Sequence, residues 1–376
     1  MKEDLITLWK ITTKRRHVQF FLILILMIIS SIFEVVSIGL VLPFLGVLTS
    51  PETVFNRQEL QPVIDFFHFT NPTELILPLT VTFIISALIT GIIRVLLLYT
   101  TTRFSYATGA DLALDVYRRT LYQEYSEHLA QNSSEIINSI TVKTHTIMAG
   151  MLNPSLIFIS SLVLIVATSF TLFFIDPTVM LISIFFFGLF YLSIIIYTHR
   201  KLRVSSKSIA KESSKIIKAV QEGLEGIRDV IIDGNQEFYS EIYRKSDIPL
   251  RKALGYIQFI NGSPRYVMES MGMVLIAGIA YFMSLQEAGL SAVIPVLGAL
   301  ALGAQRILPA LQQSYGAYTS IKSSKSSFID VLNLLEKPLP RNNSLLTSPP
   351  IIFKKNIHIN NISFKYSGTK KEVLKN

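Results

Sequence analysis

Long runs of apolar residues, separated by polar segments, dominate this chain. A helix that crosses a membrane needs about 20 predominantly apolar residues. Runs that meet this requirement are Val18–Leu48, Glu74–Thr100, Leu152–Ile175, Thr178–Tyr197, Tyr266–Leu285 and Leu290–Tyr315. The pattern therefore predicts an all-α membrane protein with six transmembrane helices.

The segments between these runs are of two kinds. Residues 174–177 and 284–289 are tight turns without Lys or Arg, whereas residues 101–151 and 198–265 are long, polar and helical in pattern. Lys and Arg also gather before the first run, and this bias marks the cytoplasmic side of a membrane protein. We therefore expect both termini and both long segments in the cytoplasm, with the tight turns outside.

Two parts of the long segments, Asp111–His128 and Val204–Gln221, contain neither Pro nor Gly. Because these two residue types most disfavour a helix interior, we expect the spans to continue as helices well beyond the bilayer. Gly223, Gly226 and Gly234 then predict a turn and a small helix that lies across the end. Such rods with a cross-piece form a lever on which a cytoplasmic domain can act.

On the outer side, residues 53–70 combine the apolar residues Leu60, Val63 and Phe66 with polar neighbours. This pattern favours a short helix on the outer membrane surface. The alternative is an irregular loop packed on the spans.

The composition supports a membrane protein and excludes several other classes. Charged residues make up 16% of the chain, against about 25% in soluble domains. The net charge of +9 comes from residues that flank apolar runs rather than from a basic patch on a soluble fold, so we do not expect nucleic-acid binding. There is no Cys, which excludes disulfides and thiolate metal sites, and the His residues show no ligand spacing.

The composition changes after the last apolar run. Lys337–Pro350 is rich in Pro and Asn, as a linker is, and Ile357–Tyr366 alternates apolar and polar residues like a strand. The predicted domains are a six-helix transmembrane domain (residues 1–336), a linker (337–350) and a short β start of a soluble domain (351–376).

Three motifs resemble, in the same order, those of the six-helix ABC exporters. They are Glu222–Arg228 (EGLEGIR), Val331–Pro338 (VLNLLEKP), and Ile362–Tyr366 (ISFKY) followed by Val373–Asn376 (VLKN). The resemblance implies an ATP-driven exporter that works as a homodimer. It also implies that the third motif opens an ATP-binding domain, in which Tyr366 stacks on the adenine of ATP, bound with Mg.

The chain departs from this family in one respect. It has no G-x-x-x-x-G-K-[ST] phosphate loop, whose backbone N–H groups and Lys hold the phosphates of ATP. We therefore expect a chain truncated at the start of the ATP-binding domain, which does not hydrolyse ATP by itself, although the full-length exporter would be a transport ATPase.

Within the exporters, Ser31–Phe44 resembles the branch that flips lipid-linked oligosaccharides. This narrower resemblance implies a multi-pass protein of the inner (plasma) membrane and an anionic, amphiphilic substrate.

Arg94 and Arg306 lie inside predicted spans and Arg265 lies at the inner edge of one. All three are candidate substrate-binding residues, because an ionisable residue inside a span costs about 2.5–3.5 kcal/mol to insert. Arg94, Arg265 and Arg306 lie roughly 30, 30 and 24 Å from the outer ends of their helices, at about 1.5 Å per residue. Their similar depth predicts, in a dimer, a ring of guanidinium groups that binds the phosphate oxygens of a lipid pyrophosphate. The alternative is that Arg265 pairs with Glu269 and the other two extend to the inner headgroups.

Two further charged features each allow two interpretations. Glu34, in the middle of the first span, is either a hydrogen-bonded structural residue or a proton relay. Five basic residues recur at spacings that place them on one helical face, and this face is either a solvated surface or an electrostatic guide for anionic headgroups. They are Arg203, Lys207, Lys211, Lys215 and Lys218.

The leading functional hypothesis is therefore the transmembrane half of an ATP-driven flippase for a lipid-pyrophosphate-linked oligosaccharide. The closest alternative is an exporter of drugs, phospholipid or peptide. A membrane glycosyltransferase would need paired carboxylates or a D-x-D site, which the cytoplasmic segments lack. A third alternative is a natural fragment without a transport role.

Overall fold

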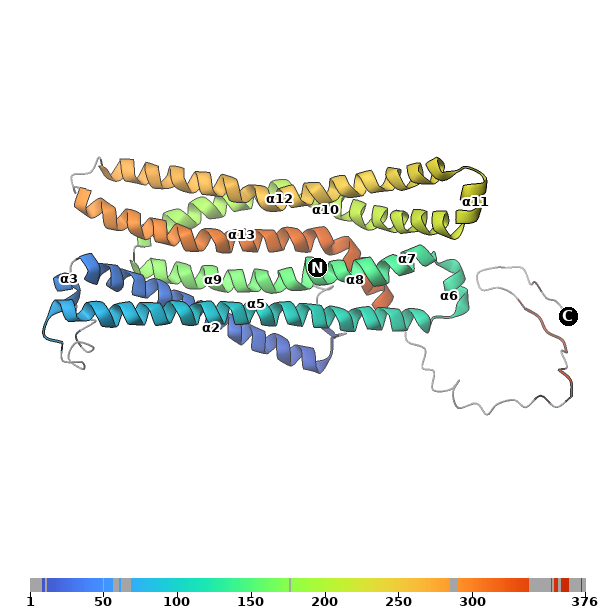
Figure 1. Cartoon of the computed structure of the whole chain (residues 1–376), viewed down its shortest axis with the longest axis horizontal. Helices are drawn as coiled ribbons and strands as arrows, with labels where there is room; N and C mark the ends of the chain where they lie inside the picture. Colours follow the sequence, from blue (N-terminus) through green and yellow to red (C-terminus); the bar gives the residue numbers. More distant parts are fainter. Residues whose placement is uncertain are drawn as a thin grey trace.

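The computed structural model contains long helices that run side by side along its longest axis (Figure 1). The structure describes residues 9–10, 12–49, 51–56, 61, 69–175, 177–284, 290–337, 353, 355–357, 360–364 and 373. Within the helices, no side chain of residues 290–306 is described.

The described elements are all helical. They are α2 (Lys14–Thr49), α3 (Pro51–Phe55), η1 (Pro72–Leu75), α5 (Ile76–Leu121), α6 (Tyr125–Ala130), α7 (Ser133–Asn138), η2 (Ser139–Lys143), α8 (Thr144–Ile147), η3 (Met148–Leu152), α9 (Asn153–Ile175), α10 (Pro177–Glu225), α11 (Ile227–Ile232), α12 (Gln236–Ser284) and α13 (Leu290–Leu335).

The apolar runs predicted from the sequence lie in α2, α5, α9, α10, α12 and α13. Three stretches of the described residues are long and apolar enough to cross a membrane: Lys14–Leu48, Pro72–Leu121 and Ser133–Thr171. The prediction of an all-α membrane protein is confirmed at this level. The count of six spans stays a prediction.

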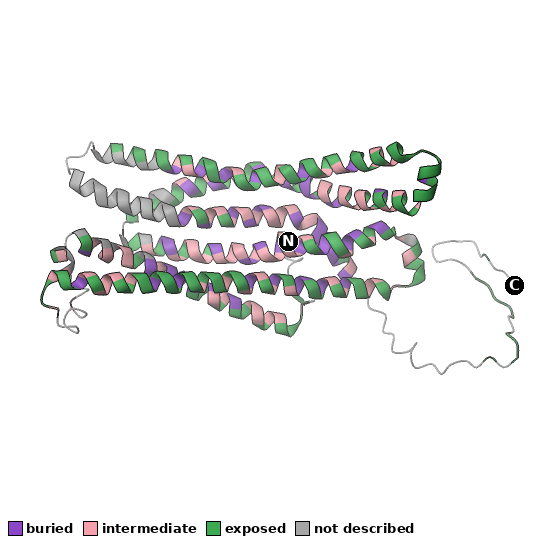
Figure 2. Cartoon of the chain, in the orientation of Figure 1, coloured by how far each residue is buried: buried purple, intermediate pink, exposed green. Residues whose placement is uncertain are grey.

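Apolar side chains on α5 face outward instead of forming a core. Leu77, Val81, Leu88 and Ile92 are all exposed, and exposed positions predominate along this part of α5 (Figure 2). A water-soluble protein rarely leaves a contiguous apolar surface of this kind exposed. Lipid is the solvent that this face fits.

The helices pack as two groups that several contacts join. Helix α2 packs on α5 and α9, α10 packs on α12, and α13 packs on α9, α10 and α12. The most extensive junction is that of α13 with α9, and α10 also contacts α9. Val47, near the end of α2, and Leu75 of η1 are buried in one apolar cluster, so these two helix ends lie at the same level.

The predicted helical extensions and the cross-piece are present. Helix α5 continues to Leu121 and α10 to Glu225, and α11 connects α10 to α12 across their ends (Figure 1). Gly234 has φ +69, a left-handed conformation that favours glycine. There the Asn235 N–H donates to the carbonyl oxygen of Val230 at 2.9 Å and ends α11.

The first long polar segment (residues 101–151) is less regular than its sequence indicates. Helices η2 and η3 are π-helical turns on either side of α8. Lys143, the last residue of η2, is buried, and its Nζ lies 2.6 Å from Oδ2 of Asp330 in α13. This ion pair fixes the irregular segment to α13.

Several predictions fall largely outside the described residues. Helix α3 and Gln61 are the described helical parts of the predicted outer helix (residues 53–70), and the linker from residue 338 onward lies outside the description. In residues 351–376 the Val373 N–H donates to the carbonyl oxygen of Phe364 at 2.8 Å, and none of the described residues there forms a strand. The β start stays a prediction.

Candidate functional site

A cavity of about 330 Å³ lies within the membrane-spanning part, lined by residues of α2, α5, α9 and α13. Met27 and Leu156 are buried apolar residues of its wall. Polar groups also line it: Ser30, Ser31, Glu34, Arg94, Thr101, Ser160 and Gln313. The cavity therefore offers apolar walls with a few polar groups, which is typical of ligand sites.

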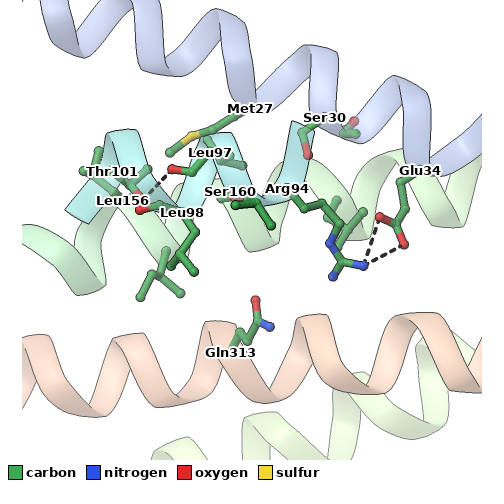
Figure 3. Close-up of a pocket in the computed structure, with 14 residues that line it drawn as sticks. Met27, Ser30, Glu34, Arg94, Leu97, Leu98, Thr101, Leu156, Ser160 and Gln313 are labelled. Carbon is green, nitrogen blue, oxygen red and sulfur yellow. Dashed lines mark hydrogen bonds and ion pairs between the residues drawn. The ribbon is translucent and has the colours of Figure 1, made fainter. Parts of the chain in front are cut away.

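Glu34 of α2 and Arg94 of α5 point toward one another at one end of this cavity (Figure 3). Arg94 Nη1 lies 3.5 Å from Glu34 Oε1 and 3.4 Å from Oε2. The side chain of Glu34 is 4% exposed and that of Arg94 is 50% exposed. The carboxylate is thus enclosed, whereas half of the arginine side chain is open to a ligand.

Neighbouring contacts hold the two helices in register at this point. Thr90 lies one turn before Arg94 on α5, and its hydroxyl donates to the carbonyl oxygens of Phe33 at 3.2 Å and Ser86 at 2.8 Å. Phe33 directly precedes Glu34. The register of α2 and α5 therefore sets the separation of the two charged side chains.

The pairing also places the Arg94 head group relative to the ends of α2 and α5. Glu34 lies about 22 Å from the end of α2 and Arg94 about 27 Å from the start of α5, at about 1.5 Å per residue, and these ends lie at the same level. Since the guanidinium reaches back to Glu34, it lies nearer these helix ends than the backbone count indicates. The depth of Arg94 in the bilayer, and with it the choice between a phosphate site and an extension to the inner headgroups, stays a prediction.

The ion pair is long for a charge-assisted hydrogen bond, for which about 2.7–2.9 Å is usual. A guanidinium has five N–H donors in a planar fork, and the contacts with Glu34 described above are made by Nη1. Arg94 therefore keeps donors for phosphate or carboxylate oxygens. Gln313 of α13 extends toward the cavity from the opposite side (Figure 3) and adds an amide to the same space.

Of the other predicted site residues the structure describes the side chain of Arg265, which does not line this cavity. Arg265 lies on α12, where its Nε donates to Oε1 of Glu269 at 2.9 Å, which is the pairing that the alternative interpretation names. Arg306 lies in α13, with its side chain outside the described residues, and Tyr366 is also outside them. The ring of three arginines stays a prediction.

Sequence reasoning missed the neutral polar residues of the cavity. Ser30, Ser31 and Ser160 stand in apolar runs, where small polar residues are common at helix contacts. Gln313 near the end of the last run was the clearest signal, because an amide in a span needs a partner. Among the described residues, no group of His, Asp and Glu could hold a metal ion.

The fold and the site define a helical membrane protein with a partly polar cavity between its spans. The family of ABC transporter transmembrane regions matches residues 18–287 of the chain. This match covers more than half of the 376 residues, so the chain belongs to the ABC transporter transmembrane region family.

Proposed function

We propose that this chain is the transmembrane half of an ATP-driven flippase that moves a lipid-pyrophosphate-linked oligosaccharide across the inner membrane. Membership of the ABC transporter transmembrane region family supports the exporter part of the proposal. The proposal of a pyrophosphate-bearing substrate rests on Arg94, whose half-exposed side chain lines the cavity.

In this proposal two copies of the chain enclose a central cavity, and ATP with Mg²⁺ is bound by the nucleotide-binding domains that the resemblance implies. The cross-piece α11 lies at the end of α10 and α12, where it can transmit the closure of those domains to the spans. Both chain termini are cytoplasmic. The arginines Arg94, Arg265 and Arg306 bind the pyrophosphate of the cargo.

The affinity for phosphate depends on how firmly each guanidinium is already held. The Arg94–Glu34 contacts are long, and the Arg265–Glu269 pair is solvent-exposed on α12. A pyrophosphate offers more oxygens and more charge than either carboxylate. It can therefore share or replace these contacts through bidentate hydrogen bonds.

The test is ATP-dependent flipping in liposomes of a lipid-pyrophosphate oligosaccharide, by the chain together with its ATP-binding domain. A hydrogen bond to a charged group contributes about 1.5–3 kcal/mol, so each Arg→Ala change is expected to reduce flipping about tenfold or more. Lys keeps the charge but loses the fork geometry, so Arg→Lys should give an intermediate loss.

Two controls separate substrate binding from folding. Arg251→Ala removes a similar i,i+4 pair of α12, with Asp247 at 3.1 Å, outside the membrane, and should leave flipping unchanged. Arg94→Ala leaves the buried Glu34 carboxylate without this partner, so the double variant Glu34→Gln/Arg94→Ala is measured beside it. Full flipping by the triple Ala variant, with normal dimerisation and basal ATPase, would exclude the arginines and favour an apolar cargo such as a drug.

A further inference from the structure

Four cationic side chains converge on a second cavity, between α10 and α13. Arg203 and Lys207 come from α10, and Lys322 and Lys325 come from α13. Their spacings of four and three residues place each pair on one face of its helix. The cavity has a volume of about 300 Å³, and we name it the α10–α13 pocket.

These four charges have no carboxylate partner among the residues that the structure describes. None of the side chains that line the α10–α13 pocket is acidic. Further along the same basic face of α10, Lys215 pairs with Glu212 and Lys218 pairs with Glu222. The basic face is therefore neutralised at its far end and left unpaired where it meets α13.

Specific contacts hold the two walls of the pocket together. The Ser206 hydroxyl donates to Oγ of Ser326 at 3.0 Å, and the Ser326 N–H donates to the Ser206 hydroxyl at 3.2 Å. At the other end, His199 Nδ1 lies 3.0 Å from the hydroxyl of Tyr318. The cations are thus held together by the packing of the helices instead of being free to spread into solvent.

Holding like charges together costs free energy unless an anion compensates them. Burial lowers the pKa of Lys322, and the charge of Lys325 lowers it further. An anion in the pocket would remove this repulsion. The arrangement therefore fits a multiply charged anion better than it fits an empty structural contact.

The position of the pocket indicates which anions can reach it. The apolar run of α10 ends at Tyr197. Arg203 lies six residues further along the helix, which is about 9 Å because each residue adds about 1.5 Å. Lys322 follows the apolar run of α13, which ends at Tyr315, by a similar distance. The polar layer of a bilayer extends about 5–7 Å beyond the hydrocarbon on each side, so the near end of the pocket lies just beyond the headgroup layer, within reach of long Arg and Lys side chains.

We propose that the α10–α13 pocket is a binding site for a phosphate-bearing anion of the diphosphate class, distinct from the cavity that Arg94 lines. Arg203 supplies a fork for two oxygens, the lysines supply point charges, and the serine hydroxyls supply neutral donors. A lipid headgroup and free pyrophosphate share this chemistry. The site does not depend on the proposed cargo, because its test measures binding without transport.

The experiment uses the full 376-residue chain in nanodiscs of phosphatidylcholine. In one arm, inorganic pyrophosphate is titrated and its affinity measured by calorimetry. In the other arm, diacylglycerol pyrophosphate is included in the nanodisc and the lipids retained by the chain are counted by native mass spectrometry. Binding in the first arm identifies a site open to free phosphate, and binding confined to the second identifies a lipid headgroup site.

Two double variants test the pocket, Lys322→Gln/Lys325→Gln and Arg203→Gln/Lys207→Gln. Each should weaken binding about tenfold or more, since each charge-assisted contact contributes about 1.5–3 kcal/mol. Lys215→Gln/Lys218→Gln is the matched control, because it removes the same charge from the same helix at paired positions. It should change binding less than about twofold.

Three results would overturn the proposal. The first is an equal loss of binding in the control variant, which would show a non-specific electrostatic attraction. The second is binding in which the pocket variants equal the wild type in both arms. Absence of binding by the wild type in both arms would overturn the proposal as well. Because the variants remove like-charge repulsion, each should elute as the wild type does and unfold at the same temperature or a higher one. These two measurements verify that each variant is folded.

Discussion

The ion pair between Lys143 and Asp330 predicts an asymmetric response to removal of either partner. Lys143 Nζ and Asp330 Oδ2 are 2.6 Å apart, and the side chains are 9% and 41% exposed respectively. Asp330→Asn leaves an ammonium group enclosed without its counter-charge. Lys143→Met leaves only a carboxylate that water can solvate, and Met fills the space of the Lys chain.

The magnitudes follow from burial. Removing one partner of a fully buried pair costs about 3–5 kcal/mol. Because Asp330 is 41% exposed, water reaches the pair and the cost of Asp330→Asn is reduced to about 1–3 kcal/mol. Lys143→Met is expected to cost less than about 1 kcal/mol. The double variant should be more stable than Asp330→Asn alone, since no buried charge remains.

The assay is the apparent midpoint of thermal unfolding in detergent, at a fixed heating time, because unfolding of membrane proteins is often irreversible. A loss of 1 kcal/mol corresponds to about 2–4 °C in a domain of 150–250 residues, so Asp330→Asn should lower the midpoint by several degrees. Asp247→Asn, which breaks an exposed pair with Arg251, is the control and should have little effect. A larger loss for Lys143→Met than for Asp330→Asn would refute this reasoning.

Two further predictions concern packing and orientation. A Cβ on Gly150 of η3 would lie 2.0 Å from Oγ of Ser324 in α13. Gly150→Ala should therefore lower the unfolding midpoint, since overpacking costs about 1–3 kcal/mol of stability, and adding Ser324→Gly should restore the midpoint. No recovery in the double variant would contradict the contact. The chain has no Cys, so single cysteines can report the orientation. A cysteine in place of Ser284 should react with an impermeant maleimide from the outside, and one in place of Lys245 should react from the cytoplasm. The reverse pattern would overturn the proposed orientation.

The apolar pattern predicted the helices well, because lipid offers no hydrogen-bond partners. The backbone N–H and C=O groups of each apolar run must therefore pair with one another, as they do in a helix. The continuation of α5 and α10 beyond these runs was predictable from the absence of Pro and Gly, and α11 was predictable from Gly226 and Gly234. These features depend on local sequence. Local sequence therefore fixed most of the helical architecture.

The π-helical turns η2 and η3 were not predictable, because they depend on how residues 139–152 fit against α13. The same holds for the site. Glu34 had no assignable partner, since its contact with Arg94 is set by the packing of α2 on α5. The α10 half of the α10–α13 pocket was visible as a basic face, but only the fold brings Lys322 and Lys325 beside it.

The Glu34–Arg94 contact has a consequence for how the protein enters the membrane during synthesis. Glu34 is carried by α2 and Arg94 by α5, so the ribosome delivers the acidic helix first and the basic helix next. Each charge alone opposes insertion by about 2.5–3.5 kcal/mol, and each is compensated once both are present. The two helices are thus suited to leave the translocon together as a hairpin, with the first retained until the second arrives.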